Sequence, residues 1–334
     1  MDVVRVAVIG GGSWGTTIAS LAAQNAPTML WSRRPEVVDE VNEHQRNSHY
    51  LAGLALHPEL RASKSLAEVV EQADVLVMGV PSHGFRCTLV EIEPHLRPWV
   101  PLVSLAKGLE QETNLRMTEI AAEVVPGHPA GVLTGPNLAK EILSGHPAAA
   151  VLAMTDARIA ERLQRVFASD GFRVYTNSDV IGCEIAGALK NVIALAAGMA
   201  SGLGTGDNTL AAVMTRGLSE LTRLGVAMGG EPATFAGLAG MGDLVATCIS
   251  TQSRNRHVGH ELGRGRPVDA VVAEMDQVAE SVKSVTVVKQ LAERYGVDMP
   301  IVNEMYEVVV HGRSATDAYR GLLQRKVGRE AHGS

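Results

Sequence analysis

VVRVAVIGGGSWGTTIA, residues 3–19, decides the fold of the first half of the chain. Residues 3–9 are rich in β-branched side chains, which is typical of a strand buried on both faces. Gly10, Gly12 and Gly15 follow at the spacing G-x-G-x-x-G, and a helical segment comes next. The first glycine permits a tight turn, the second lets a pyrophosphate approach the backbone, and the third brings helix and strand together. The stretch predicts a dinucleotide-binding unit, against the alternative of a glycine turn without a ligand.

The rest of the chain separates into a strand-rich part and a helical part. Further buried strands are predicted at 28–31, 74–80, 101–106, 130–134, 148–154 and 172–176. Helices are predicted at 184–206, 210–224, 232–238, 254–262, 268–273, 282–295, 301–309 and 315–323. We therefore expect an α/β fold, with an N-terminal Rossmann-like dinucleotide-binding domain over residues 1–178 and an all-α substrate domain over residues 179–334.

Composition excludes several classes of protein. With 46% hydrophobic residues, 20% charged residues and a net charge of −6, the chain is typical of a soluble globular protein. We expect no nucleic-acid partner, no secretory signal and no stable membrane insertion, because the apolar stretch 184–206 contains Glu, Lys and Asn. The three cysteines lie far apart, and His257 and His260 lack acidic or Cys partners at ligand spacing, so no metal is expected. We expect a cytoplasmic homodimer.

Lys190 is the one basic residue in the long apolar stretch 184–206. Burial disfavours the charged form of a lysine and lowers its pKa from about 10.4 towards a range where it can exchange protons. The alternative is a lysine whose ammonium reaches solvent along the helix surface. The residues that contact Lys190 in the folded protein distinguish these two interpretations.

Charged side chains follow two of the predicted strands, where ligands bind in open α/β sheets. Ser32, Arg33 and Arg34 follow the second strand, where an NAD site has an acidic residue for the ribose 2′-hydroxyl. Arginines there suit the 2′-phosphate of NADP, although exposed arginines on a surface loop are the alternative. Lys107 follows the strand 101–106 and is a candidate substrate contact or else a solvated loop lysine.

Two polar clusters interrupt the helical part. Asp243 lies in the glycine-flanked stretch LAGMGDL, and it could hold the Lys190 ammonium or accept a hydrogen bond from a substrate hydroxyl. Ser253 could cap a helix that carries Arg254 and Asn255 in its first turn. Amide groups of a helix N-terminus and a guanidinium together form an anion site, and an ordinary surface helix start is the alternative.

Taken together, these stretches resemble the bacterial-type NAD(P)-dependent glycerol-3-phosphate dehydrogenase family, over roughly residues 4–325. The matching pieces are GGGSWGT from Gly10, SLAKGLE around Lys107, TGPNLAKE around Asn137, GALKNVIALAAGM around Lys190, GDNTLAAVMTRGLSE from Gly206, LAGMGDLVATC around Asp243 and QSRNR around Arg254. The GALKN and GDLVATC…QSRNR pieces are far more specific than the glycine pattern.

The resemblance implies roles for particular residues. The lysine of the GALKN pattern, here Lys190, is implied to be the catalytic acid/base. Substrate contacts are implied for Lys107, Gly135, Asn137, Lys190, Asp243, Ser253, Arg254 and Asn255. Cofactor contacts are implied for Ser13, Trp14, Arg33, Arg34, Lys107, Ala139, Arg254, Val278 and Glu280, beside the glycines of the turn. Many relatives have Ser or Thr where this chain has Asn137.

The implied reaction is reversible hydride transfer between NADP(H), or NAD(H), and C2 of dihydroxyacetone phosphate. The product sn-glycerol 3-phosphate feeds phospholipid synthesis, and the site is expected between the two domains. Two alternatives remain: a β-hydroxyacid or 6-phosphogluconate-type dehydrogenase, which would act on 3-hydroxy acids, and a nucleotide-binding sensor without catalysis. The QSRNR and GMGDLVATC pieces favour the glycerol-3-phosphate dehydrogenase over the β-hydroxyacid or 6-phosphogluconate-type enzyme. The presence of Lys190, Lys107 and Arg254 favours it over the sensor without catalysis.

Overall fold

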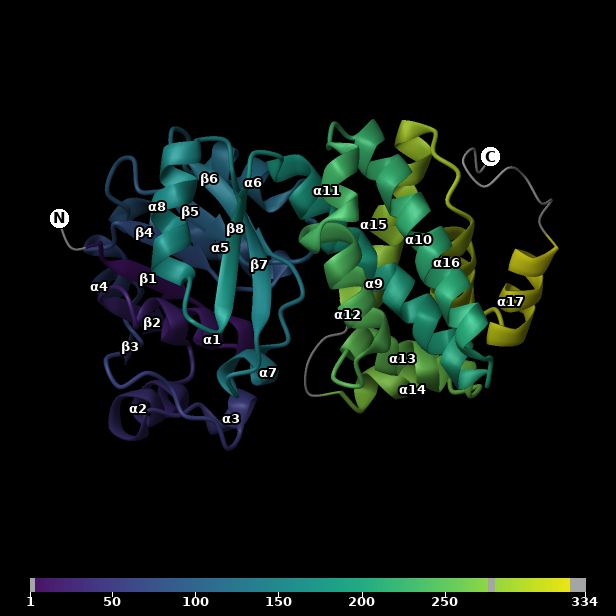
Figure 1. Cartoon of the computed structure of the whole chain (residues 1–334), viewed down its shortest axis with the longest axis horizontal. Coiled ribbons are helices and arrows are strands. Elements are labelled where there is room, and N and C mark those ends of the chain that lie inside the picture. Colours follow the sequence, from purple (N-terminus) through teal and green to yellow (C-terminus); the bar gives the residue numbers. More distant parts are fainter. Residues whose placement is uncertain (1–3, 276–279, 325–334) are drawn as a thin grey trace. The chain divides into compact units, whose positions relative to one another are not determined.

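The computed structural model describes residues 4–275 and 280–324. The chain divides into two compact units, one formed by residues 1–110 and 115–180 and the other by residues 111–114 and 181–334. The short segment 111–114 thus belongs to the second unit, although it precedes most of it in the sequence. The first unit is an α/β sheet structure, and the second is helical (Figure 1).

The first unit is built on one eight-stranded sheet in the order β3-β2-β1-β4-β5-β6-β7-β8. Its strands are β1 (Val6–Ile9), β2 (Thr28–Trp31), β3 (Arg61–Ser63), β4 (Val75–Met78), β5 (Leu102–Ser104), β6 (Ala130–Thr134), β7 (Ala148–Met154) and β8 (Phe172–Asn177). All neighbours pair in parallel except β6 and β7. The sequence did not indicate β3, an edge strand of three residues with a single buried side chain.

Helices cover both faces of this sheet. They are α1 (Ser13–Ala22), α2 (Pro35–His44), α3 (Ser48–Leu51), α4 (Leu66–Glu71), α5 (Ser82–Ile92), η1 (Glu93–His95), α6 (Met117–Val124), α7 (Ala139–Leu143) and α8 (Ala157–Phe167). Side chains alternate along β1, so that Val6 and Val8 enter one apolar core while Ala7 and Ile9 enter a second one. Helices α1 and α8 contribute to the first core, and α4, α5 and α6 contribute to the other.

The second unit contains helices only among the residues that are described. They are α9 (Val180–Gly202), α10 (Asp207–Ala227), α11 (Pro232–Ala236), the π-helical turn η2 (Leu238–Gly242), α12 (Asp243–Ile249), α13 (Arg254–Gly263), α14 (Val268–Ala273), α15 (Glu280–Tyr295), α16 (Pro300–His311) and α17 (Ala315–Leu323). Helix α12 was not predicted, because its sequence had been interpreted only as a polar cluster.

Helix α9 corrects one expectation from the sequence. By length and composition it is apolar enough to cross a membrane, with a mean hydropathy of 1.6, although its Glu, Lys and Asn residues predict that no stretch of the chain has a membrane-spanning pattern. In the structure 94% of this apolar window is buried within the protein. Length and hydropathy alone do not distinguish a membrane span from a core helix, and the burial of α9 identifies it as the core helix of the second unit.

Glycines let α9 and α13 pack with their backbones in contact. A Cβ atom added to Gly198 of α9 would lie 2.0 Å from the carbonyl oxygen of Arg256. A Cβ atom added to Gly259 of α13 would lie 2.0 Å from the carbonyl oxygen of Leu195. No larger residue fits at either crossing point without a shift of the helices. The first turn of α13 is therefore held close against α9.

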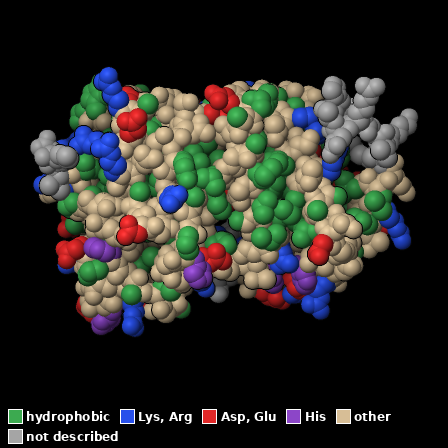
Figure 2. All heavy atoms as spheres, viewed as in Figure 1, with side chains coloured by type: hydrophobic (Ala, Val, Ile, Leu, Met, Phe, Trp, Pro, Cys, Tyr) green, Lys and Arg blue, Asp and Glu red, His purple; other side chains and the backbone are tan. Residues whose placement is uncertain are grey.

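The surface carries charges of both signs. On the face shown in Figure 2, Lys and Arg side chains alternate with Asp and Glu side chains, and broad uncharged areas lie between them. This interspersed pattern agrees with the modest net charge of −6. A protein that binds nucleic acid along its backbone typically presents a basic stripe or patch instead.

Candidate active site

The glycine turn of the first unit has room for a ligand at one position and none at the others. Gly10 has a φ of 121°, and an added Cβ would lie 2.7 Å from the Gly79 carbonyl oxygen. At Gly15 an added Cβ would lie 2.1 Å from the Gly10 carbonyl oxygen. At Gly12 it would meet no atom within 4 Å, and this residue is the N-cap of α1. The turn therefore leaves open space where the amide groups of a helix N-terminus can receive a pyrophosphate.

Residues beside the turn offer further polar groups. The indole Nε1 of Trp14 is buried without a hydrogen-bond partner in the described part of the chain, and its ring packs edge-on against Phe172. Such a buried donor is costly unless a ligand or water accepts its hydrogen bond. The Ser13 hydroxyl donates to the Tyr50 carbonyl oxygen over 3.5 Å. Ala139, at the start of α7, packs against the same apolar core as Trp14.

The end of β2 presents two exposed guanidinium groups. Arg33 and Arg34 are both exposed, and neither has an ion pair or a side-chain hydrogen bond within the described residues. Ser32 is buried, and its hydroxyl accepts a hydrogen bond from the Arg34 amide over 3.2 Å. A Cβ atom at Gly11 would lie 2.8 Å from the same hydroxyl, so Ser32 borders the glycine turn. Ser32 thus lies near the glycine turn with two guanidinium groups beside it. This arrangement suits a ribose 2′-phosphate better than a ribose 2′-hydroxyl.

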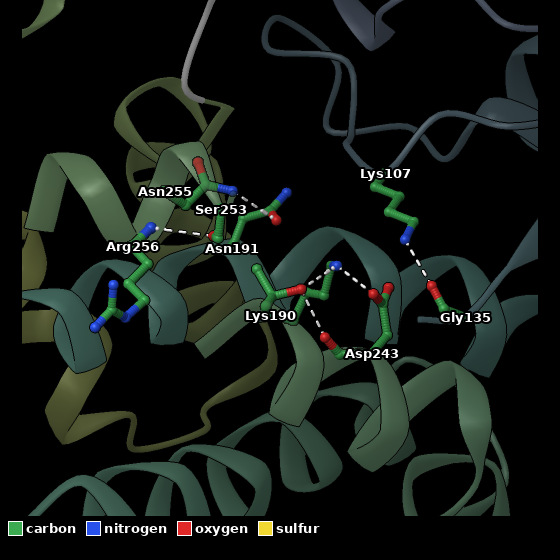
Figure 3. A network of polar contacts seen from close by, with 9 residues as sticks. Lys107, Gly135, Lys190, Asn191, Asp243, Ser253, Asn255 and Arg256 are labelled. Atoms are coloured by element: carbon green, nitrogen blue, oxygen red, sulfur yellow. Dashed lines mark hydrogen bonds and ion pairs between the residues drawn. The ribbon is translucent and has the colours of Figure 1, made fainter. Parts of the chain in front are cut away.

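Lys107, Gly135 and Asn137 lie at the carboxyl ends of the neighbouring strands β5 and β6. The Lys107 ammonium donates to the Gly135 carbonyl oxygen over 2.8 Å (Figure 3). Both amide atoms of Asn137 and the hydroxyl of Thr134 are buried without hydrogen-bond partners among the residues described. Buried polar groups normally have partners, so this corner of the first unit is equipped to receive a polar ligand.

Lys190 lies at the centre of the second unit, and its ammonium does not reach solvent. The residue is 4% exposed, so the alternative of a lysine extending to the surface is wrong. Its Nζ atom donates to Asp243 Oδ1 over 2.5 Å and to Thr247 Oγ1 over 2.7 Å (Figure 3). Asp243 begins α12, and Thr247 follows one turn later on the same face. Helix α12 therefore supplies both observed partners from one face.

The environment of Lys190 exerts two opposite effects on its charge. Burial favours the neutral form of an amine, whereas an adjacent carboxylate favours the ammonium. The Thr247 hydroxyl donates to the Asp243 carbonyl oxygen over 2.6 Å, and this bond directs its lone pairs towards Lys190. Burial also raises the pKa of the nearby Cys248 thiol to about 12, so that this thiol stays protonated and unreactive. Lys190 is thus a buried amine held in a fixed orientation by two hydrogen bonds.

The first turn of α13 has the cap that the sequence predicted. The Ser253 hydroxyl accepts a hydrogen bond from the Arg256 amide over 3.2 Å, and Arg254 is exposed. Asn255 is buried between helices: its Nδ2 donates to Asn191 Oδ1 over 2.9 Å, and its Oδ1 accepts from the Ser281 amide over 3.1 Å. The Asn255 amide therefore already joins α9, α13 and α15, and it keeps only one further N–H for a ligand.

Two cofactor residues named from the sequence cannot be placed. Val278 lies outside the described residues, and Glu280 begins α15 with a side chain that is likewise outside them. Sequence reasoning missed Thr247, for which the spacing of four residues from Asp243 is the available signal. Within residues 4–275 and 280–324, no group of three or more His, Cys, Asp and Glu side chains could hold a metal ion.

Known proteins match the chain along nearly its whole length. Residues 5–160 match the profile of the NAD-dependent glycerol-3-phosphate dehydrogenase N-terminus, and residues 179–320 match that of the C-terminus. Glycerol-3-phosphate dehydrogenase [NAD(P)+] 2 of Sphingopyxis alaskensis is 57% identical over 98% of this chain and 99% of its own length. The corresponding enzyme of Mycobacterium avium is 55% identical over 99% of this chain and 97% of its own length.

A solved structure agrees with these sequence matches. The crystal structure of glycerol-3-phosphate dehydrogenase from Coxiella burnetii superposes with a TM-score of 0.92 at 33% identity, covering 97% of this chain and 99% of that one. The glycine turn, the sheet order and the helical second unit are thus those of an NAD(P)-dependent dehydrogenase. The chain belongs to the NAD-dependent glycerol-3-phosphate dehydrogenase family and is an oxidoreductase.

Proposed function

We propose that the protein reduces dihydroxyacetone phosphate to sn-glycerol 3-phosphate reversibly, with Lys190 as the acid/base and NADP(H) as the preferred cofactor. The single observation that carries the chemical part is the buried Lys190, hydrogen-bonded to Asp243 and Thr247. Reduction of the ketone develops negative charge on the C2 oxygen, and an oriented ammonium stabilises that charge and delivers the proton. In the oxidative direction the neutral amine accepts the proton from the C2 hydroxyl.

Asp243 serves the lysine in this proposal. Its carboxylate holds the Lys190 ammonium over 2.5 Å, which fixes the direction of the proton. The Thr247 hydroxyl, 2.7 Å from Nζ, fixes a second direction. An amine constrained in this way loses little orientational freedom when the ketone arrives, and such positioning accounts for a large part of enzymatic rate enhancement.

Substrate phosphate and cofactor phosphate are assigned to different cationic groups. Arg254, with Ser253 and Asn255 at the first turn of α13, is proposed to hold the dianionic substrate phosphate, because this residue is exposed at a helix N-terminus, where the helix dipole favours an anion. The substrate is also proposed to contact Lys107, Gly135 and Asn137. A bound nicotinamide cofactor supplies the hydride.

The cofactor contacts proposed in the first unit follow the glycine turn. Gly12 and Ser13 meet the pyrophosphate at the start of α1, and Arg33 and Arg34 meet the 2′-phosphate. The absence of an acidic side chain at Ser32 supports NADP(H) over NAD(H). We further propose that the enzyme is a cytoplasmic homodimer that supplies glycerol 3-phosphate to phospholipid synthesis.

Initial-rate kinetics test the reaction and the cofactor preference together. The purified protein is assayed with dihydroxyacetone phosphate against NADPH and NADH, and in parallel with 3-hydroxy acids against NADP+. We expect turnover with dihydroxyacetone phosphate and a higher kcat/KM with NADPH than with NADH. Activity on 3-hydroxy acids without activity on dihydroxyacetone phosphate would overturn the substrate assignment, and equal kcat/KM values would overturn the cofactor assignment.

A further inference from the structure

We propose that the ion pair between Arg86 and Glu110 positions Lys107, so that both residues act on the substrate through that lysine. The inference rests on the proposed role of Lys107 as a substrate contact. Arg86 lies in none of the motifs quoted above, and Glu110 ends the SLAKGLE piece without an assigned role of its own. Both are positioning residues, since neither is assigned a contact with a ligand.

The pair has the geometry of a bidentate clamp. Arg86 lies on α5, and its Nε and Nη2 atoms donate to the two carboxylate oxygens of Glu110, each over 2.8 Å. The side chains are 31% and 16% exposed, so solvent screens the pair less than it screens a fully exposed one. The third nitrogen, Nη1, contacts Glu123 Oε2 over 2.8 Å, and Glu123 is 54% exposed. Both carboxylates raise the pKa of the Arg86 guanidinium, which keeps the clamp charged.

Glu110 fixes one end of the short loop that carries Lys107. The backbone amide of Glu110 donates to the Leu115 carbonyl oxygen over 3.0 Å. Between Lys107 and Glu110, the Cα of Gly108 lies so close to α5 that an added Cβ would be 2.7 Å from the Ser82 hydroxyl. At the other end, Lys107 Nζ donates to the Gly135 carbonyl oxygen over 2.8 Å. The loop is thus held against α5 and β6 over a span of four residues.

The chemistry of the clamp explains why it can direct a lysine three residues away. A bidentate arginine–carboxylate pair fixes direction as well as distance, because the planar fork aligns two hydrogen bonds at once. A lysine on a free loop loses rotamer and backbone freedom when it binds a ligand. A loop already fixed at Glu110 and Gly108 loses less of this conformational freedom. Loss of the clamp is therefore expected to weaken what Lys107 does without removing any group that touches substrate.

Steady-state kinetics with dihydroxyacetone phosphate and NADPH test the inference, with two variants at the same guanidinium. E110Q removes the charge and one arm of the clamp, and we expect kcat/KM for dihydroxyacetone phosphate to fall about 10-fold or more, mainly through KM. E123Q removes only the exposed partner of Arg86, and we expect a change of less than about twofold. Equal effects of E110Q and E123Q would overturn the inference.

A double-mutant cycle separates action through Lys107 from a general effect on the fold. If Glu110 acts through Lys107, K107A/E110Q is no slower than K107A alone, whereas independent effects multiply. Multiplying effects would overturn the inference. A K107A variant with normal kinetics would instead remove Lys107 from the proposed function, which is a different failure.

Thermal melting of each variant shows whether a change in its kinetics comes from a loss of stability. If E110Q melts far below the wild type, R86K takes its place, because lysine keeps the positive charge and loses the planar fork. We expect R86K to raise KM and to show the same non-multiplying behaviour with K107A. An R86K variant with wild-type KM would contradict the positioning role.

Discussion

The two units provide their binding groups in different ways. In the first unit these groups lie at strand ends and in a glycine turn, where Gly12 faces open space and Arg33 and Arg34 are exposed. In the second unit Lys190 and Asp243 are buried, and they lie on helices of the core. A group at the sheet edge can change without disturbing the packing. In the helical unit, the proposed chemistry and the stability of the fold depend on the same side chains. Four experiments test this contrast.

Replacement of Lys190 should give the largest effect. In K190M we expect kcat to fall by about 10³-fold, because the proton donor is lost, while NADPH binding in the first unit stays nearly intact. We also expect a loss of about 3–5 kcal/mol of unfolding free energy, since Asp243 keeps a buried charge without its observed partner. Steady-state rates measure kcat, cofactor fluorescence measures NADPH binding, and denaturant unfolding measures the unfolding free energy. K190M/D243N should regain stability but no turnover, and near-normal turnover in K190M would exclude Lys190 as the acid/base.

One substitution, glycine to alanine, should act in opposite ways in the two units. In G259A the added methyl meets the Leu195 carbonyl oxygen at 2.0 Å, and we expect a loss of about 1–3 kcal/mol of unfolding free energy. In G12A the methyl meets no protein atom within 4 Å, so stability should hold while NADPH binding weakens. Thermal melting and cofactor titration distinguish the two outcomes. A destabilised G12A with normal cofactor affinity would contradict the assignment of that space to the pyrophosphate.

The arginines after β2 should affect cofactor choice alone. In R33A/R34A we expect KM for NADPH to rise about 10-fold or more, which is the loss expected when hydrogen bonds to a charged phosphate are removed. KM for NADH should stay the same, because NADH lacks the 2′-phosphate. Both KM values come from one set of initial-rate measurements. A parallel rise in both would show that these arginines do not read the 2′-phosphate.

Glu220 should affect stability without affecting catalysis. Glu220 is 3% exposed, and its carboxyl group accepts hydrogen bonds from the Ile301 and Val302 amides of α16. Burial raises the pKa of Glu220 from 4.5 to about 7, although the α16 amides and Arg223 lower it, while Asp298 raises it further. The folded protein therefore binds this proton more tightly than the unfolded chain does.

The sign of the pH effect follows from that difference. The contribution of Glu220 is fully present below pH 4.5 and is lost as the pH rises through about 7. We expect the unfolding free energy of the wild type to fall by about 1–3 kcal/mol from this group between pH 5 and 8, and E220Q to flatten that fall. Denaturant unfolding at several pH values measures the unfolding free energy of both proteins. An E220Q variant with the wild-type slope would assign the pH dependence to other groups.

Much of the fold follows from local sequence. Strands β6 and β7 begin and end where they were predicted, because each is a buried apolar run bounded by turn residues. Strand β3 was missed, because its three residues carry little pattern of their own and are ordered by pairing with β2. The antiparallel pairing of β6 with β7 was not foreseen either. A strand's direction is set by how the connecting chain returns to the sheet, which local periodicity does not encode.

The candidate site shows the same limit. Lys190 stood out because a lone lysine in an apolar helix is chemically unusual. The contact between Lys190 and Asp243, 53 residues further along the chain, was proposed from the sequence and is confirmed. Thr247, 57 residues beyond Lys190, was missed, because its contact depends on how α12 packs against α9. The Arg86–Glu110 clamp could not be predicted for the same reason: Glu110 ends the SLAKGLE piece, but no local pattern indicates that Arg86, 24 residues earlier, lies beside it.

The burial of α9 has a consequence for how the protein is made. The contacts described here for this helix come from later residues: Gly217 of α10 packs on Ile193, Gly259 of α13 packs on Leu195, and Asp243 pairs with Lys190. A ribosome releases the chain from its N-terminus, at about 5–20 residues per second. For several seconds the nascent chain therefore exposes a helix as apolar as a membrane span. During that interval the apolar surface of α9 is open to aggregation, because the helices that bury it have not yet been made.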